Sequence, residues 1–312
     1  MNIPFPGEFA ALGTAICWTF GSQFFEAAGK RVGAMSVNLL RLVLAFLFFC
    51  LVSLITSGHF IPMDFPLKSW MWLGLSGIIG FSLGDLFLFH AFVDIGPRLS
   101  MLIMTLTAPL SALMGLFFLG EIYVWYQWVG MSLTLLGVSW VILERPSQRA
   151  QQDQVSARRP RKFRRVTRGG VLMALLGTFG QAAGYILSKY GMYVDGVYQD
   201  AFAATQIRVI GGTLGFIFII SFRGYWPQLL KSLTNRPAMG FILGGAFMGP
   251  FLGVSLSLLA LHYTTAGVAA TITALVPVFL IPSVILIGRE HVTIRAVLGA
   301  IIAVGGVCLL MI

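Results

Sequence analysis

The sequence repeats itself, and this repeat limits the possible folds of the chain more than any other feature. Gly80-x-x-x-Gly84 returns 169 positions later as Gly249-x-x-x-Gly253, and Glu121 matches Glu290 at the same offset. Further matches at offsets between 159 and 168 join Thr19-Phe20-Gly21 to Thr178-Phe179-Gly180, Lys30 to Lys189, Arg41 to Arg208 and Pro109 to Pro277. Because short insertions in loops account for the drift in offset, the chain is predicted to contain two copies of one unit.

Composition indicates that both copies lie in a membrane. The 312 residues are 57% hydrophobic and 10% charged, and apolar runs of about 20 residues are long enough to cross a bilayer as helices. Ten such runs are predicted, at 8–28, 36–57, 70–92, 100–119, 124–143, 170–190, 201–222, 238–261, 266–287 and 293–312. The predicted fold class is therefore an all-α integral membrane protein of ten transmembrane helices. An odd number of spans per copy inverts the second copy, which gives two inverted five-helix repeats.

The basic residues predict the orientation of the chain. We divide it into a first repeat at 1–144, a basic linker at 145–168 and a second repeat at 169–312. The net charge of +10 falls mainly in the linker and in the connections on the same side of the membrane. The positive-inside rule then places the linker in the cytoplasm and both termini outside, in the cytoplasmic (inner) membrane. We interpret the basic run as a topology determinant near anionic lipid, so nucleic acid is not an expected partner.

Residues with metal-binding or catalytic chemistry are sparse. Cys17, Cys50 and Cys308 all fall inside predicted helices and lack metal-ligand spacing, so neither a metal nor another cofactor is expected. The sequence has no HExxH pair, no phosphate-binding loop and no plausible serine, histidine and acid set within the spans. We predict that the protein is not an enzyme and has no catalytic residues.

Glycine and proline in the spans indicate close helix contacts and bends. The GxxxG pairs recur at equivalent places in both halves, where they form either fixed crossings or surfaces that slide. Pro109 and Pro277 occupy matching places and each removes a backbone hydrogen bond. We predict a kink in each half beside a central cavity, with a kink that only improves packing as the alternative.

These motifs resemble those of a known family. Ala108-Pro109, Leu119-Gly120-Glu121 and Leu135-Leu136-Gly137-Val138 are similar to the closing half of an EamA-type repeat, and Val276-Pro277, Gly288-Arg289-Glu290 and Val304-Gly305-Gly306-Val307 form the second copy. The chain thus resembles ten-helix members of the drug/metabolite transporter superfamily. The resemblance implies a central substrate cavity, alternating access between the halves and a monomer, with a homodimer as the alternative.

Charged residues inside the spans are the first candidates for a site, because each costs about 2.5–3.5 kcal/mol to insert. Asp85 has no basic residue within one helical turn, and its match in the other half is Val254. It either carries a proton or a cationic substrate, or it is paired with an arginine or the backbone. Glu26 either belongs to the pathway or pairs with Lys30 four residues on.

Further candidates come from both halves. Arg41 and Arg208 either extend to an interface or form a symmetric gate or anion contact. Trp18, Gln23, Gln181 and Tyr185 lie on repeat-matched stretches and complete the predicted substrate or ion pathway.

Residues near the helix ends receive structural interpretations. We expect Lys189 to extend to the membrane interface and His90 to form a hydrogen bond at a helix end. Glu121 and Glu290 are expected to cap helices or fix loops.

The function that best fits these observations is secondary transport. We predict a carrier that moves a small organic metabolite, such as an amino acid, across the membrane by alternating access. Export is the expected direction, driven by proton exchange or running as uniport. The alternative is an uncoupled facilitator, a channel-like protein or a lipid-flipping protein built from the same repeats.

Overall fold

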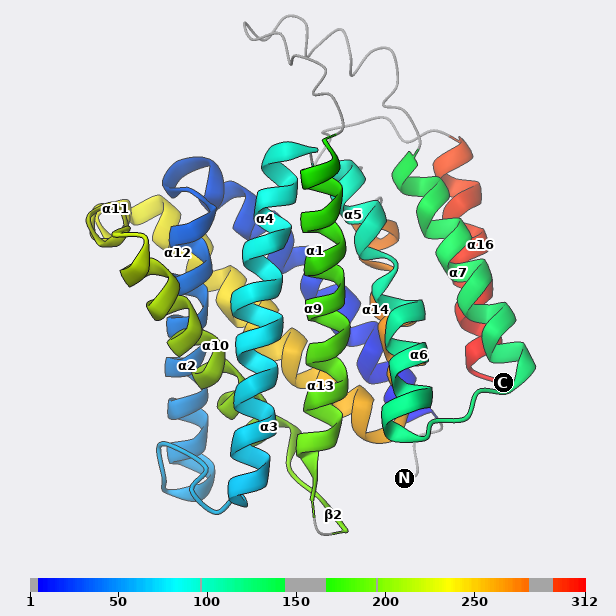
Figure 1. Ribbon diagram of the computed structural model, residues 1–312, viewed down its shortest axis with the longest axis horizontal. Coiled ribbons are helices and arrows are strands. Elements are labelled where there is room, and N and C mark those ends of the chain that lie inside the picture. Colours follow the sequence, from blue (N-terminus) through cyan, green and yellow to red (C-terminus); the bar gives the residue numbers. More distant parts are fainter. Residues whose placement is uncertain (1–4, 96, 144–166, 195, 281–293) are drawn as a thin grey trace, which may run out of the picture.

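A computed structural model describes residues 5–95, 97–143, 167–194, 196–280 and 294–312. The predicted linker up to residue 166 and Glu290 lie outside the described residues. The described chain is a bundle of helices with one small hairpin (Figure 1), so the all-helical fold class is confirmed.

The first half contains seven α-helices and one π-helix. They are α1 (Pro6–Val32), α2 (Ala34–Ser57), α3 (Leu67–Gly77), η1 (Ile78–Gly84), α4 (Asp85–Asp94), α5 (Pro97–Met104), α6 (Thr107–Leu119) and α7 (Trp125–Leu143). The helices α3, η1 and α4 follow one another without a break in the chain and act as one long segment. The first half therefore supplies five segments, because α5 and α6 also lie end to end.

The second half repeats this order with two small additions. Its elements are α9 (Arg168–Met192), β1 (Tyr193–Val194), β2 (Val197–Tyr198), α10 (Ala201–Phe222), α11 (Trp226–Leu233), α12 (Arg236–Ala246), η2 (Phe247–Gly253), α13 (Val254–Tyr263), α14 (Ala266–Thr273) and α16 (Ile294–Leu310). The strands pair as an antiparallel hairpin, and α11 is a short amphipathic helix between α10 and α12. Helices α12, η2 and α13 again form one continuous segment.

Local sequence explains where several helices begin and end. Thr167 caps α9 by accepting a hydrogen bond from the Gly170 backbone N–H at 3.1 Å. Asp200 caps α10 in the same way, accepting from Ala203 at 2.8 Å. Between α1 and α2 the chain turns at Gly33, whose φ of 81° is a conformation that favours glycine.

Within the described residues, seven helices are long and apolar enough to cross a membrane, and Ala266–Leu280 and Val297–Leu310 are shorter apolar helices. Helix α1 has 27 residues but is not among the seven, because polar side chains such as Thr14, Thr19 and Gln23 lower its hydropathy. Many large apolar side chains face outward; Phe222 is 87% exposed and Phe117 is 77% exposed. An apolar exterior of this kind suits lipid rather than water. The chain is a multi-pass membrane protein, while ten crossings stay a prediction.

The two halves interlock rather than pack as separate units. Helix α1 of the first half packs along α12, η2 and α13 of the second, and α9 of the second half packs along α3, η1 and α4 of the first. The later segments pair across the halves as α6 with α14 and α7 with α16. In Figure 1, α1 leads away from the end of the molecule that holds both termini, whereas α9 runs toward that end. The buried hydrophobic residues that the structure describes form one core cluster drawn from both halves.

Close packing between the halves depends on small residues. A Cβ atom on Gly137 of α7 would come within 2.8 Å of Ala303 Cα in α16, and one on Gly180 of α9 would come within 3.1 Å of Gly84 Cα. Because lipid provides little hydrophobic drive for helix association, such backbone contacts are what hold the halves together.

Both long third segments change to π-helix at the same point. η1 and η2 each have seven residues, and each begins and ends at positions 169 apart. The matched pairs Gly80-x-x-x-Gly84 and Gly249-x-x-x-Gly253 lie inside them. π-helices are rare and occur often at functional sites, so their recurrence at matched places makes both segments candidates for a functional region.

The fourth segments are also interrupted at matching places. Helix α5 ends at Met104 and α6 begins at Thr107, whereas α14 ends at Thr273 and helical structure resumes at 276. Pro109 lies in the first turn of α6, and Pro277 lies in the first turn of the helical stretch that resumes at 276. A proline is tolerated there because a first-turn N–H has no intrahelical partner, and the Thr105 carbonyl accepts from the Ala108 N–H at 3.3 Å. The interruptions lie beside both prolines, while the predicted kinks and their role in movement stay predictions.

Candidate functional site

Three charged side chains are buried where the two halves meet. Arg41 comes from α2 and Arg208 from α10, and Asp85 is the first residue of α4, directly after η1. All three residues are buried, and Arg208 is only 1% exposed. Because their positions are set by segments of both halves, any relative motion of the halves acts on these charges.

Arg41 and Asp85 form an ion pair through Arg41 Nη2 and Asp85 Oδ2. Gln181 of α9 donates from Nε2 to Asp85 Oδ1 at 3.1 Å and to the Gly80 carbonyl of η1 at 3.2 Å. The carboxylate is thus held from both halves. The sequence left two roles open for Asp85, a transport role or a pairing with an arginine or the backbone. The contact with Arg41 is the arginine pairing of the second role.

Aromatic rings surround both arginines. The guanidinium carbon of Arg41 lies 6.0 Å from the ring centre of Trp18 and 5.3 Å from that of Phe25. The guanidinium carbon of Arg208 lies 4.7 Å from the ring centre of Phe81 and 5.9 Å from that of Tyr185. The face of an aromatic ring stabilises a buried cation. It supplies no hydrogen-bond acceptor for the N–H groups at the edge of the guanidinium.

Arg208 occupies space that two glycines leave open. A Cβ atom on Gly80 or on Gly184 would lie 3.0 Å from Arg208 Nη2. Its Nε and Nη1 atoms, like the Nε atom of Arg41, are buried and have no hydrogen-bond partner in the part of the chain that the structure describes. Buried arginine donors are almost always paired, so these unpaired donors are an unusual feature of the centre.

The structure brings together six of the eight residues predicted for the pathway: Trp18, Arg41, Asp85, Gln181, Tyr185 and Arg208. Glu26 instead pairs with Lys30 at 2.5 Å on an exposed face, as the local alternative predicts. Gln23 donates to the Thr19 carbonyl of its own helix at 3.2 Å. We name the six gathered residues, with Phe25 and Phe81, the central cluster.

Sequence reasoning missed Phe25, Phe81 and Gly184 as contributors. The two rings are ordinary apolar residues of a membrane helix, and nothing in their spacing separates them from the other 24 of the chain's 26 phenylalanines. Gly184 stands four residues after Gly180, a spacing that indicates close helix packing but not a contact with an arginine.

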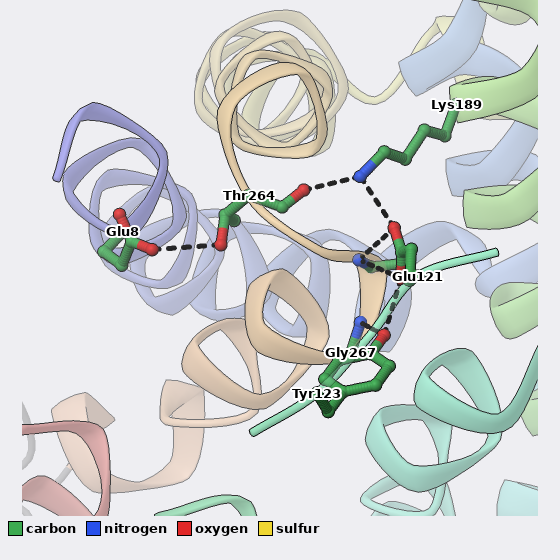
Figure 2. A network of polar contacts seen from close by, with 7 residues as sticks. Glu8, Glu121, Tyr123, Lys189, Thr264 and Gly267 are labelled. Atoms are coloured by element: carbon green, nitrogen blue, oxygen red, sulfur yellow. Dashed lines mark hydrogen bonds and ion pairs between the residues drawn. The ribbon is translucent and has the colours of Figure 1, made fainter. Parts of the chain in front are cut away.

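A second buried polar group, drawn in Figure 2, lies at the end of α9, and Figure 1 shows that α9 runs toward the end of the bundle that holds the termini. Lys189 at the end of α9 pairs with Glu121 at 2.7 Å and donates to the Thr264 carbonyl at 2.6 Å. Glu121 accepts from the Ala266 N–H, at the first residue of α14, at 3.0 Å. We name Glu121, Tyr123, Lys189, Thr264 and Gly267 the peripheral network.

The tyrosine completes this network. Tyr123 donates its hydroxyl hydrogen to Glu121 Oε2 at 2.6 Å, and its oxygen accepts from the Gly267 N–H at 3.1 Å (Figure 2). Burial, followed by the hydrogen bond and the charge of Glu121, raises the pKa of Tyr123 well above its ordinary value. Every charged or phenolic group of the network thus has a partner.

The three helix-end residues that the structure describes differ in how they compare with their expected roles. Glu121 caps α14 through the Ala266 N–H, as its expected role requires. The interfacial interpretation of Lys189 is wrong, because its side chain is 14% exposed and reaches inward to Glu121. His90 lies 3.3 Å from Arg223 Nη2 through its Nε2 atom, on an exposed face.

Among the residues that the structure describes, no three histidine, cysteine, aspartate or glutamate side chains gather as a metal site. The free cysteines do not approach one another as a disulfide.

A lipid-facing bundle of two interlocked, matched halves with charge buried between them defines a membrane transporter. The chain belongs to the EamA-like transporter family, whose sequence model matches residues 5–143 and 168–312. The family is part of the drug/metabolite transporter superfamily, so the predicted family is confirmed and the chain is a membrane transporter of that type.

Solved structures share the fold. One, described only as the crystal structure of a protein, aligns with a TM-score of 0.72 and 13% identity over 99% of this chain and 97% of its own. At that identity the likeness shows the fold alone. No curated protein matches the chain by sequence.

Proposed function

We propose that the protein is a secondary transporter that moves a small organic solute across the membrane by alternating access around the central cluster. The observation that supports this most strongly is the burial of Arg41, Asp85 and Arg208 at the junction of the halves. Charge inside a membrane span is costly and marks substrate or ion pathways. Export out of the cytoplasm is the proposed direction.

The places where movement would occur surround the same cluster. Asp85 directly follows η1, and η2 lies at the matching place against α1. The fourth segments are interrupted before Pro109 and Pro277. Interrupted helices let one half rock against the other while backbone groups exchange partners near a cavity.

Asp85 is the proposed coupling residue. When its carboxylate is ionised it holds Arg41 and accepts from Gln181, which joins both halves. Binding of a proton removes the charge that attracts Arg41, so the ion pair would open. Proton binding and reorientation of the halves are therefore linked through one side chain.

The proposed topology has ten crossings as two inverted repeats in the cytoplasmic membrane. Helix α7 ends and α9 begins at the end of the bundle opposite both termini (Figure 1), which agrees with a cytoplasmic linker and outer termini. We also propose that the monomer is functional. Reporter fusions after residues 33, 155 and 312 test the topology, because an active periplasmic reporter after residue 155 would overturn it.

Purified protein in proteoliposomes tests the function. A panel of amino acids and other small metabolites is added outside liposomes that hold a pH-sensitive dye and an imposed proton gradient. We expect at least one solute to dissipate the gradient through the wild-type protein. Asp85→Asn should retain solute exchange but lose at least about tenfold in proton-driven flux, because the charge that responds to protons is gone.

Asp94→Asn is the matched control, since Asp94 ends the same segment on an exposed face and should leave flux unchanged. If Asp85→Asn retained the pH dependence of flux, the coupling assignment would be wrong. Solute flux without proton movement would identify an uncoupled facilitator, and movement of a labelled lipid alone would identify a lipid-flipping protein.

A further inference from the structure

The duplication is incomplete at one position in the central cluster. Arg41 and Arg208 occupy matching places in the two halves, but Asp85 corresponds to Val254. Both Asp85 and Val254 directly follow a π-helix of seven residues, η1 and η2. The first half thus has an arginine and its carboxylate, whereas the second half has the arginine alone.

The contacts of the two arginines follow this difference. Arg41 forms an ion pair with Asp85, although its Nε atom has no hydrogen-bond partner among the described residues. Arg208 lies close enough to Asp85 to feel its charge, but it forms no ion pair among the described residues, and both its Nε and its Nη1 atoms lack hydrogen-bond partners there. Helix α10, which carries Arg208, packs against α13, which begins at Val254. A carboxylate at position 254, the match of Asp85, would therefore belong to a helix that contacts the helix of Arg208. Arg41, Asp85 and Arg208 together carry a formal charge of +1 in a buried setting.

Two explanations are open for a buried arginine without a carboxylate. One is purely structural, because stacking on Phe81 and Tyr185 could suffice to hold the side chain. The other is that a ligand supplies the missing charge. The glycines beside Nη2 favour the second, since Gly80 and Gly184 hold space for the guanidinium at the contact of η1 with α9 rather than letting larger residues fill it.

We propose that the transported solute is an organic anion whose carboxylate pairs with Arg208, in the role that Asp85 has toward Arg41. This inference rests on the proposed function and specifies the substrate class of the same site. An arginine prefers a carboxylate or phosphate partner, and aromatic rings on both sides suit a flat organic body. Because Arg208 is 1% exposed, the anion reaches it only when the halves move.

The first test measures binding to the purified full-length protein. The probes are benzoate, phenylacetate and succinate, each compared with its uncharged amide by thermal shift and calorimetry. We expect at least one carboxylate to raise the melting temperature while its amide does not. Arg208→Met should weaken carboxylate binding by at least about 30-fold.

The melting temperature without probe separates a ligand contact from a structural one. Arg208→Met removes an unpaired buried charge, so it should raise the melting temperature of the unliganded protein by about 2–4 °C. Arg41→Met is the matched control at the equivalent position; it leaves Asp85 without its cation and should lower the melting temperature. If Arg208→Met lowered the melting temperature and the variant still bound carboxylates better than their amides, Arg208 would be a structural residue and the proposal would be overturned.

A second variant restores the symmetry of the duplication. Val254→Asp places a carboxylate at the position that matches Asp85 and should give Arg208 an internal partner. We expect the preference for carboxylate over amide to disappear, while the isosteric Val254→Thr keeps it. Retained preference in Val254→Asp would count against the proposal even if Arg208→Met failed to fold.

Transport measurements keep this inference separate from the proposed function. If neutral or cationic solutes are transported and carboxylates are no better than their amides, the transporter assignment stands and the anion assignment fails. If carboxylates bind with the expected preference but no solute crosses the membrane, the anion site stands and the transport assignment fails.

Discussion

The central cluster and the peripheral network each bury a carboxylate against a cation, yet they differ in how completely their polar groups are paired. In the peripheral network Glu121 meets Lys189, Tyr123 and a helix N-terminus, and the phenol itself accepts from Gly267. In the central cluster Asp85 accepts from Arg41 and Gln181. Among the described residues, however, Arg208 has two nitrogens without hydrogen-bond partners and no ion pair, and Arg41 has one such nitrogen.

This difference teaches which buried charges hold the fold and which are available to a ligand. A fully paired network gains nothing from a solute and loses stability when one member is removed. A group with unpaired donors is less stable than it could be, which is tolerated where function requires it. The peripheral network is therefore expected to act as a fastening between the halves, and the central cluster as the working site.

The largest expected effect is on stability in the peripheral network. Lys189→Met leaves the Glu121 carboxylate buried without its cation, and we expect a loss of about 3–5 kcal/mol in the free energy of unfolding. Thermal or denaturant unfolding of the purified protein measures this loss. The double variant Lys189→Met with Glu121→Gln should recover part of it, because no unpaired charge remains. A change below about 1 kcal/mol would break the distinction between the two regions.

A smaller effect is expected at the tyrosine of the same network. Tyr123→Phe removes the hydrogen bond to Glu121 and leaves the Gly267 N–H without its acceptor, which should cost about 1–3 kcal/mol of stability. The rate of solute transport, measured with equal amounts of folded protein, should stay within about twofold of the wild-type rate.

The raised pKa of Tyr123 makes this contribution dependent on pH. A phenol whose pKa is raised in the folded protein stabilises the fold fully below the ordinary value of about 10, and this stability is lost as pH rises above it. Wild-type stability should therefore fall more steeply than that of Tyr123→Phe between about pH 9.5 and 11. Parallel curves for the two proteins would contradict the assignment.

The smallest effect concerns the space around Arg208. Gly184→Ala places a methyl group 3.0 Å from Arg208 Nη2, so the guanidinium has to shift by a few tenths of an ångström. We expect a change below about 1 kcal/mol in stability, together with weaker carboxylate binding. Gly29→Ala is the control, because nothing lies within 4 Å of its added methyl group. Equal binding by both variants would remove Gly184 from the site.

Much of the architecture follows from the sequence because it depends on local patterns. Apolar runs predict helices whatever their neighbours are, and the matched motifs place the π-helices and proline breaks at corresponding points in both halves. The candidate residues Arg41 and Asp85 are identified by the cost of charge in a membrane span. Their pairing is not, because they lie 44 residues apart and meet only through the packing of separate helices.

The error at Lys189 has the same cause. A lysine near a helix end is free to extend toward the interface when its helix is considered alone. Glu121 is 68 residues earlier in the chain, and only the contact between the halves places it within 2.7 Å. Long-range partners of this kind have no signature in the neighbouring sequence.

The sequence by itself determined that this chain is a duplicated helical membrane protein of the EamA-like transporter family, and that Val254 breaks the match with Asp85. These properties follow from the periodicity, the composition and the internal repeat of the sequence, none of which depends on how distant segments pack. Only the tertiary structure decided that each half packs its first helix into the other, that Arg41 pairs with Asp85, and that two nitrogens of Arg208 lack hydrogen-bond partners among the described residues. Pairing between buried charges depends on distances between distant segments, and folding alone sets those distances.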